Sequence, residues 1–537
     1  MIRSRPFSFL LAVLLWGALL APVRAQEPAA AAGASVAGVL TAPEAVRPAI
    51  DLADLDAFVE ALREEWHVPG LAVGAIKDGQ VVLAKGYGYR NLEDRQPVTE
   101  RTLMAIGSNS KSFTVVVLGM LEDEERLAWD EPVRRYLPDF QLQDDYAAQK
   151  MTVRDLVIHR SGLPRHDLLW YGRSFDRAEL FKRLRHLEPT TSFRGRWQYQ
   201  NLMFMTAGYL SERLTGRTWD DLVHERIFQP LGMARSNTSV RDMPGSDDFS
   251  YPYMYRDGKL ERVPFRNIDN VAPAGSINSS AEEMLHYVQF HIANGEYDGQ
   301  RLLSEENTLA MQSPQTLVSG FPNDPEMGIS TYGMGLMATT YRGHKLVQHG
   351  GGIDGFISAM AWLPEEKIGV VVLSNMSGES NPVPNLVAQR LFDELLGLEP
   401  VDWNARTRKA MEEGRQRQEQ RRAEQAKERV EGTYPSHALS DYAGTYEHPG
   451  YGVLEVRAAS AGLEVALDAF TAPLEHFHYD VFEFGENQGQ IPLSGRVTFG
   501  MDAKGVIDRV MVPLEPSVDP IVFQRKPEGR VAAGQGS

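Results

Sequence analysis

Ser108 and Lys111 stand three residues apart, a spacing that allows nucleophilic catalysis. The apolar run after Ser108, KSFTVVVLGMLEDEERL, predicts a buried helix that begins near Ser108, just after the flexible Gly107. Positions i and i+3 of a helix share a face, with roughly 5 to 6 Å between their Cβ atoms, so the Lys111 amine could reach the Ser108 hydroxyl. A desolvated, neutral lysine could then accept the serine proton. The alternative interpretation is a helix cap beside a solvated lysine.

Two further motifs follow along the chain. Tyr199 and Asn201, in RGRWQYQNLMF, offer a phenol that can relay a proton and an amide that can bind a substrate amide. The alternative here is the capped start of a helix. His349 and the three glycines after it follow an apolar strand edge, and glycines without side chains let a substrate acyl group approach the backbone. The alternative is a glycine-rich turn, but the three motifs in this order favour a catalytic interpretation.

With these motifs the chain resembles the serine beta-lactamase-related hydrolases, which include class C beta-lactamases, D-Ala-D-Ala carboxypeptidases, D-aminopeptidases and esterases. The resemblance covers most of residues 50 to 400, including the phrases VPGLAVGAIKDGQVVLAKGYGYRN, LVIHRSGLPRH, PAGSINSSAEEM and YGMGL. It implies an α+β fold, with an antiparallel sheet flanked by helices and a mostly helical lobe. Strand-like runs at both ends of this region, with helical patterns between them, indicate the same architecture.

The resemblance also implies a role for each motif residue. Ser108 would be the nucleophile, and Lys111 and Tyr199 would share the role of general base. Asn201, His349 and Gly351 would bind the substrate. The backbone N–H groups of Ser108 and Gly352 would form the oxyanion hole. Many lactamases carry lysine where this chain has His349. Because histidine titrates near neutral pH, it would hold a substrate carboxylate less firmly as pH rises. Histidine at this place is also found among the family's peptidases and esterases, which argues against a dedicated lactamase. Gln200, where the family often has a small residue, affects how the substrate would be seated.

Other catalytic chemistries have little support in the sequence. The HGGG string resembles an oxyanion element of lipases, but the Gly-x-Ser-x-Gly elbow that accompanies it is absent. There is no cysteine, no His-Glu-x-x-His and no phosphate-binding Gly-Lys-Ser/Thr loop. His476 and His478 lack a third ligand, which favours a surface or partly buried pair, and His159 is interpreted as structural. We therefore expect no metal and no cofactor.

The N-terminal residues predict an export signal. Arg3 and Arg5 precede an apolar stretch from Phe7 to Leu20, and small residues end at Ala25, the expected cleavage site. The apolar stretch is shorter than the roughly 20 residues that span a bilayer. We therefore expect a periplasmic or secreted protein with no stable membrane anchor after cleavage.

Length and charge limit the remaining possibilities. The 537 residues, 43 % of them hydrophobic, are enough for two folded units. The formal net charge of −17 disfavours nucleic acid as a partner, so the expected partner is a small molecule or a short peptide. The sequence leaves the oligomeric state open.

The predicted organisation has six parts. They are a signal peptide (1–25), a flexible linker (26–47), a serine hydrolase domain (48–400), a charged helical linker (401–436), a small antiparallel β domain, sheet or barrel (437–527), and a disordered tail (528–537). The predicted function is an exported serine hydrolase that acylates Ser108 and cleaves D-amino-acid peptides or small esters. The alternatives are a class C-like beta-lactamase and a catalytically idle module that binds a cell-wall peptide.

Overall fold

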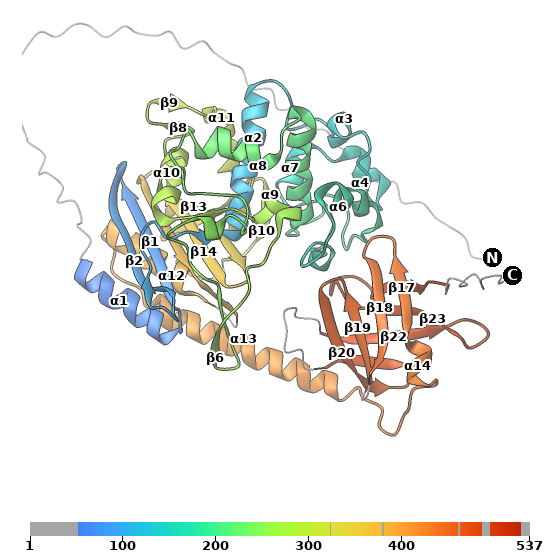
Figure 1. Cartoon of the computed structure of the whole chain (residues 1–537). Helices are drawn as coiled ribbons and strands as arrows, with labels where there is room; N and C mark the ends of the chain where they lie inside the picture. The colour runs from blue at the N-terminus through green and yellow to red at the C-terminus, as the bar shows by residue number, and fades with distance from the viewer. Residues whose placement is uncertain (1–51, 323, 379–380, 460–461, 486–493, 528–537) are drawn as a thin grey trace, which may run out of the picture. The chain divides into compact units, whose positions relative to one another are not determined.

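The computed structural model describes residues 52–322, 324–378, 381–459, 462–485 and 494–527 (Figure 1). These residues belong to one structural unit. The predicted signal peptide (1–25), flexible linker (26–47) and C-terminal tail (528–537) lie outside the described residues.

A nine-stranded antiparallel sheet forms the centre of the N-terminal part. Its order is β10 (Thr316–Ser319), β11 (Ser330–Tyr332), β12 (Met337–Tyr341), β13 (His344–Ile353), β14 (Phe356–Leu363), β15 (Ile368–Ser374), β1 (Gly70–Lys77), β2 (Gln80–Asn91) and β3 (Gln96–Pro97). Asp78 and Gly79 join β1 to β2, and both have positive φ (50° and 76°), as the favoured two-residue hairpin turn requires. An Asp-Gly pair between two apolar strands is the typical sequence signal for this turn.

Helices cover both faces of this sheet (Figure 1). In β1, Leu71 and Val73 pack toward α1 (Leu52–Glu65) and α12 (Val383–Leu396), while Ala72 packs with α10 (Ala281–Ile292) on the opposite face. Alternate residues of a strand point to opposite faces, so a strand covered on both sides must be apolar at nearly every position. This explains the continuous apolar run LAVGAI.

A mostly helical lobe occupies the middle of the chain. Its long buried helix is α2 (Ser110–Asp123), which contacts α7, α8, α9 and α11. The lobe and its surroundings contain α3 (Val133–Tyr136), α4 (Asp145–Lys150), α5 (Val153–Leu156), α6 (Arg177–Arg183), α7 (Asn201–Thr215), α8 (Trp219–Val223), α9 (Ala272–Gly275) and α11 (Glu305–Met311). Short strands accompany them: β4 (Met104–Ala105) with β7 (Asn278–Ser279), β8 (Glu296–Tyr297) with β9 (Gln300–Arg301), and β16 (Met376–Gly378) with β5 (Tyr253–Arg256) and β6 (Lys259–Arg262).

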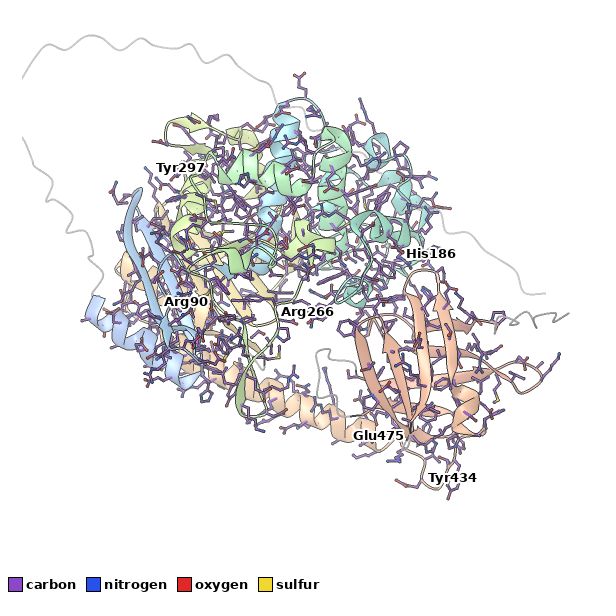
Figure 2. All side chains as sticks on the ribbon, in the orientation of Figure 1. Arg90, His186, Arg266, Tyr297, Tyr434 and Glu475 are labelled. Atoms are coloured by element: carbon purple, nitrogen blue, oxygen red, sulfur yellow. The ribbon has the colours of Figure 1, made fainter. Side chains whose placement is uncertain are left out.

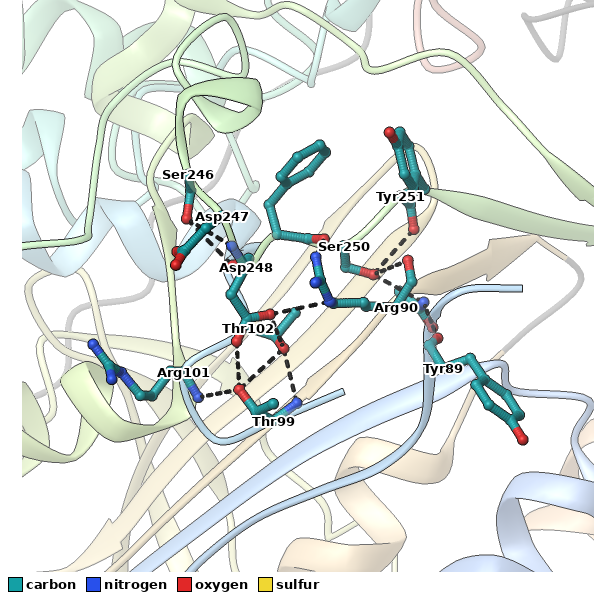
Figure 3. Close-up of polar contacts among 12 residues, drawn as sticks. Tyr89, Arg90, Thr99, Arg101, Thr102, Ser246, Asp247, Asp248, Ser250 and Tyr251 are labelled. Carbon is teal, nitrogen blue, oxygen red and sulfur yellow. Dashed lines mark hydrogen bonds and ion pairs between the residues drawn. The ribbon is translucent and has the colours of Figure 1, made fainter. Parts of the chain in front are cut away.

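Asp248 forms hydrogen bonds with residues 99–103, the segment just before β4 and Ser108 (Figure 3). Its two carboxylate oxygens accept hydrogen bonds from Thr99 Oγ1 (2.5 Å) and Thr102 Oγ1 (2.6 Å), and Arg90 lies 3.3 Å away as an ion-pair partner. The backbone N–H of Leu103 also donates to the Asp248 carbonyl (3.0 Å). Hydrogen bonds to a charged group are stronger than neutral ones, so this cluster fixes the chain just before Ser108.

The C-terminal part is a closed all-β barrel, which confirms the predicted small antiparallel β domain. It contains β17 (Gly444–His448), β18 (Gly452–Ala459), β19 (Gly462–Leu467), β20 (Phe470–His478), β21 (Val481–Phe484), β22 (Arg496–Met501), β23 (Ile507–Val512) and β24 (Ile521–Arg525), preceded by the short helix α14 (Leu439–Tyr442). In β18, Leu454 and Val456 are buried while Val453 and Glu455 are exposed. Successive side chains of a strand point to opposite faces, so this alternation of period two is typical of a strand with one face in the barrel core.

The charged stretch between the two parts contains α13 (Trp403–Ala426) (Figure 1). Its buried residue is Trp403, whose indole Nε1 donates to Asp393 Oδ2 at 3.2 Å. The helix is otherwise mostly exposed, because its sequence is charged all round and lacks an apolar stripe.

Candidate active site

Ser108 lies in a short 3₁₀ turn, Gly107–Asn109, that runs directly into α2. Gly107 has φ 53°, and a Cβ there would lie 2.5 Å from the Gly352 backbone N, so only glycine fits. Ser108 is half-buried, whereas every other residue from 102 to 121 is buried. A hydroxyl at a helix start that alone remains accessible within a buried segment is well placed to meet a substrate.

Lys111 is fully buried and makes three polar contacts. Its Nζ lies 3.0 Å from Ser108 Oγ, 2.7 Å from Asn201 Oδ1 and 2.7 Å from the Ala274 carbonyl oxygen. The two oxygens of Asn201 and Ala274 can only accept hydrogen bonds. A neutral amine has two hydrogens and one lone pair, so the two acceptors take its hydrogens and the lone pair faces Ser108.

The surroundings of Lys111 favour this neutral form. Burial lowers the pKa of Lys111 well below its ordinary value, and the positive charge of Arg165 adds to the effect, while Asp167 opposes it. Burial raises the pKa of Tyr199, and a hydrogen bond with Ser108 opposes that shift. The amine also lies over the Tyr199 ring, 4.7 Å from its centroid. These surroundings therefore favour the uncharged form of both candidate proton carriers beside Ser108.

Asn201 is the buried first residue of α7. Gln200 caps this helix, since its side-chain oxygen accepts from the Leu202 N–H at 2.8 Å. Asn201 Nδ2 donates to Asp167 Oδ1 at 3.0 Å, opposite the bond that its Oδ1 accepts from Lys111. Because Asp167 offers only an acceptor and Lys111 a donor, the orientation of the amide is fixed.

His349 is buried, and both of its ring nitrogens have partners. The Gly350 carbonyl can only accept, so Nδ1 carries the proton and donates to it at 2.6 Å. Nε2 therefore accepts from the Tyr332 hydroxyl at 3.1 Å. Burial is the main cause that lowers the pKa of His349 to about 3. The expectation that His349 titrates near neutral pH is wrong, because burial removes the solvation that its charged form needs.

The three glycines after His349 differ in their surroundings. Gly350 and Gly352 are exposed, but Gly351 is buried, and a Cβ on it would lie 1.8 Å from the Ile106 carbonyl oxygen and 2.5 Å from Ser358 Oγ. Glycine at 351 is therefore explained by the close approach of β13 to the turn that carries Ser108. A contact between Gly351 and substrate stays a prediction. The same approach brings the Gly352 N–H beside Gly107, as an oxyanion hole formed with Ser108 requires.

Several residues of the site were not singled out in the sequence. Tyr332 and Ala274 lie in phrases that carried the family resemblance, YGMGL and PAGSINSSAEEM, so those phrases held a signal. Arg165 and Asp167 follow the SGLP phrase, and their charges reach Lys111. His159, interpreted as structural, is buried, and its ring centroid lies 4.3 Å from that of Tyr199.

The described part of the chain contains no group of three or more His, Cys, Asp or Glu side chains that could hold a metal ion. In β20, His476 Nε2 contacts the Tyr479 carbonyl oxygen at 2.9 Å.

None of the helices within the described ranges is long and apolar enough to cross a bilayer.

Comparison with known proteins places the chain in a family. The Beta-lactamase family model matches residues 55–392. The chain belongs to the beta-lactamase family. It is therefore an enzyme of the beta-lactamase-related serine hydrolases. A second family model, a domain of unknown function (DUF3471), matches residues 428–525.

Individual relatives agree with this assignment. The chain is 30 % identical to the unguisins hydrolase ungD′ of Aspergillus campestris over 425 residues, which are 75 % of this chain and 77 % of that protein. It is 30 % identical to a D-aminopeptidase of Cereibacter sphaeroides over 375 residues, 66 % of each chain. Among solved structures, the octameric penicillin-binding protein homologue from Pyrococcus abyssi matches with a TM-score of 0.58 at 25 % identity, covering 88 % of this chain and 100 % of that one. The D-amino acid amidase from Ochrobactrum anthropi shares the fold, with a TM-score of 0.53 at 22 % identity over 64 % of this chain and 98 % of that one.

Proposed function

We propose that this protein is an exported serine hydrolase that forms an acyl-enzyme on Ser108 and cleaves amide or ester bonds. The observation that carries the proposal is the position of Lys111 Nζ, which lies 3.0 Å from Ser108 Oγ and 2.7 Å from each of two acceptor oxygens. In the neutral amine these two acceptors take the hydrogens, which leaves the lone pair for the Ser108 hydroxyl. D-amino-acid peptides and amides, or small esters, are the favoured substrates. The relatives named D-aminopeptidase, which share 30 % of their matched residues with this chain, support the D-amino-acid class.

The proposed reaction begins when Ser108 Oγ transfers its proton to Lys111 Nζ and bonds to the substrate carbonyl carbon. The carbonyl oxygen becomes an anion that the backbone N–H groups of Ser108 and Gly352 stabilise. When the tetrahedral intermediate collapses, the bond to the amine or alcohol breaks, and Lys111, assisted by Tyr199, returns the proton to the leaving group. Water then attacks the acyl-enzyme, releases the acid and regenerates Ser108. Asn201 would hold the amide on the acyl side of the substrate.

The neutral state of His349 bears on the substrate class. With a pKa of about 3, its imidazole has no positive charge at neutral pH and offers no ion pair to a substrate carboxylate. Beta-lactams and peptides with a C-terminal D-alanine carry a carboxylate close to the scissile bond, whereas amides and esters of D-amino acids do not. This difference favours an amidase, aminopeptidase or esterase over the runner-up, a class C-like beta-lactamase.

We also propose export, with cleavage after Ala25 and a periplasmic or secreted mature protein. The sequence of the first 25 residues supports it. N-terminal sequencing of the protein recovered from the periplasm or the medium is expected to begin at Gln26. An intact N-terminus in the cytoplasmic fraction would contradict it.

Intact-mass spectrometry tests the nucleophile. The protein without residues 1–25 is mixed with D-phenylalanine amide, p-nitrophenyl acetate or benzylpenicillin and quenched at intervals, and any adduct is mapped by peptide. We expect an adduct on Ser108 and a loss of turnover of several orders of magnitude in Ser108→Ala. Ser112→Ala is the matched control, because Ser112 is a buried serine of the same helix whose hydroxyl donates to the Asn109 carbonyl.

The outcomes separate the alternatives. Substantial turnover by Ser108→Ala would defeat the assignment of the nucleophile. Rapid turnover of benzylpenicillin would instead support the beta-lactamase. An idle module that binds a cell-wall peptide would bind a D-alanine-terminated peptide without any adduct or turnover.

A further inference from the structure

The C-terminal barrel contacts the chain segment that borders the candidate site. Three buried barrel residues carry the contact: Tyr451, Phe470 and Glu515. They contact His166 and Tyr171, which lie between the SGLP phrase and α6. Arg173, at the end of this segment, adds a bond from its Nε to Asp468 Oδ2 (2.7 Å) and one to the Tyr451 carbonyl oxygen (2.6 Å).

His166 is the centre of this contact. It is fully buried with φ 47°, a left-handed conformation that a non-glycine residue adopts only when its surroundings enforce it. Its backbone N–H donates to Glu515 Oε2 at 2.8 Å. Its Nε2 lies 3.0 Å from the Glu188 carbonyl, which can only accept, so Nε2 carries the proton and Nδ1 accepts from the Tyr451 hydroxyl at 2.8 Å. Two barrel side chains thus fix both the backbone and the ring of His166.

The residues on either side of His166 reach the reacting groups. Asp167 Oδ1 accepts from Asn201 Nδ2 at 3.0 Å, which sets the direction of the amide that Lys111 also contacts. The Arg165 guanidinium lies 4.8 Å from the centroid of the Tyr199 ring. A displacement of His166 would therefore move both neighbours relative to Asn201 and Tyr199.

A second series of contacts connects the barrel with the turn between β13 and β14, which follows the three glycines. Phe470 stacks on Tyr171, with ring centroids 6.1 Å apart and planes 7° apart. The Tyr171 hydroxyl donates to Asp354 Oδ2 at 2.6 Å, and Arg266, labelled in Figure 2, donates to the same oxygen at 2.8 Å. Asp354 is two residues after Gly352, in the turn between β13 and β14.

We infer that the barrel, which matches a domain of unknown function, is part of the active-site structure of this enzyme. Tyr451 and Glu515 act as positioning residues: by fixing His166 they orient Asp167 against Asn201 and thereby set the recognition of the substrate's acyl-side amide or amine. Phe470 supports the turn beside Gly352 from the other side. The expected kinetic effects rest on the proposed function, whereas the positioning of residues 165–173 by the barrel does not.

The experiment compares two tyrosines of the barrel. Tyr451→Phe removes the hydroxyl that donates to His166. Tyr446→Phe is the matched control, since Tyr446 is equally buried and its hydroxyl donates to the Tyr442 carbonyl inside the barrel at 2.8 Å. With D-phenylalanine p-nitroanilide, kcat/KM is expected to fall about tenfold or more in Tyr451→Phe and less than twofold in Tyr446→Phe, because an error of about 1 Å in positioning can cost about 100-fold. With p-nitrophenyl acetate, which has no acyl-side amide or amine, both variants should lose less than threefold.

Glu515 provides an independent variant pair. Glu515→Ala leaves the buried His166 N–H without an acceptor, whereas Glu515→Gln retains an oxygen and is expected to restore most of the activity on the anilide. Hydrogen exchange followed by mass spectrometry needs no substrate: exchange across 165–173 should rise in Glu515→Ala and Tyr451→Phe, and stay near wild type in Glu515→Gln and Tyr446→Phe.

The inference is overturned if Tyr451→Phe and Tyr446→Phe behave alike with both substrates, or if exchange rises only within the barrel. Equal losses on the anilide and on the acetate ester would also overturn it, because they would indicate general destabilisation. If the wild-type enzyme turns over neither substrate, the proposed function fails, while the exchange data still decide whether the barrel positions the segment.

Discussion

The sharpest test of the site geometry is the replacement of Gly351 by alanine, with Gly350→Ala as the control. The two residues are neighbours in the same strand, and neither has a positive φ, so alanine is compatible with both backbones. They differ in the space around an added methyl group. At Gly350 the nearest atom is the Ser358 carbonyl oxygen at 3.6 Å, an ordinary contact, whereas at Gly351 the Ile106 carbonyl oxygen lies at 1.8 Å.

The magnitude follows from these distances. To reach ordinary contact, the Ile106 carbonyl and the added methyl must separate by about 1.5 Å. This movement would also strain the bond from Ser358 Oγ to the Ile106 oxygen (2.9 Å) and the bond that Asn109 donates to Ser358 (2.8 Å). We expect a loss of about 1–3 kcal/mol in the free energy of unfolding, the usual range for overpacking.

The effect on activity should be larger than the effect on stability. Ile106 lies two residues before Ser108, and Gly352 directly follows Gly351, so the separation would move the two proposed oxyanion donors apart. A misplacement of about 1 Å can cost about 100-fold in rate, and the loss of one oxyanion donor about 100- to 1000-fold. Gly351→Ala should therefore reduce the acylation of Ser108 by about 100-fold or more, while Gly350→Ala stays within a few-fold of wild type.

The assay combines pre-steady-state acylation by p-nitrophenyl acetate with urea unfolding of both variants. The reasoning is refuted if Gly351→Ala acylates Ser108 at the rate of Gly350→Ala, because the close approach of β13 to the Ser108 turn would then have no catalytic consequence.

Three further predictions concern titratable groups and metals. Because the pKa of Lys111 is lowered by burial and by Arg165, its basic form should persist at neutral pH. The acylation rate measured from pH 5 to 10 should therefore fall only on the acidic side. Arg165→Gln should shift that fall to higher pH, and an unshifted profile would contradict the role of Arg165. Buried His291 has a pKa lowered to about 3 and no hydrogen-bond partner for either ring nitrogen. In the unfolded chain this histidine binds a proton below about pH 6.5, so the stability that its neutral form provides is complete above that pH and falls toward pH 3. Between pH 7.5 and pH 5 the wild-type protein should therefore lose about 2 kcal/mol more unfolding free energy than His291→Phe, and equal losses in urea unfolding would contradict this. Turnover should be unchanged by prolonged incubation with EDTA, and a loss reversed by added zinc would reopen metal chemistry.

Local patterns could be predicted from the sequence, and tertiary neighbours could not. The helix after Ser108 and the hairpin at Asp78-Gly79 follow from short-range periodicity and turn chemistry, and the structure contains both. The Ala274 carbonyl that accepts from Lys111 is 163 residues away along the chain, and no local pattern encodes that contact. The family phrases identified the right segments but not which atoms of those segments meet.

His349 shows most clearly why residue type alone was insufficient. An exposed histidine titrates near neutral pH, and the sequence offered no reason to expect otherwise. Its state is set by Tyr332, which donates to Nε2, and by the burial of the whole ring, both of which depend on strands that come together only in the fold. The error concerned the environment of the residue, not its location beside the site.

The charges around Ser108 explain how the pKa of a lysine is lowered in a strongly acidic protein. The net charge of −17 would favour the protonated amine at a distance, but solvent screens charges beyond about 10 Å at ordinary ionic strength. What remains is local: burial and Arg165 lower the pKa of Lys111, and Asp167, which is paired with Arg165 through a 2.5 Å bond, opposes them. Arg165 and Asp167 flank His166, the residue that the barrel holds on both its backbone and its ring. Burial makes the largest contribution to the shift of Lys111, while the smaller contributions come from two residues of the segment that the C-terminal barrel contacts.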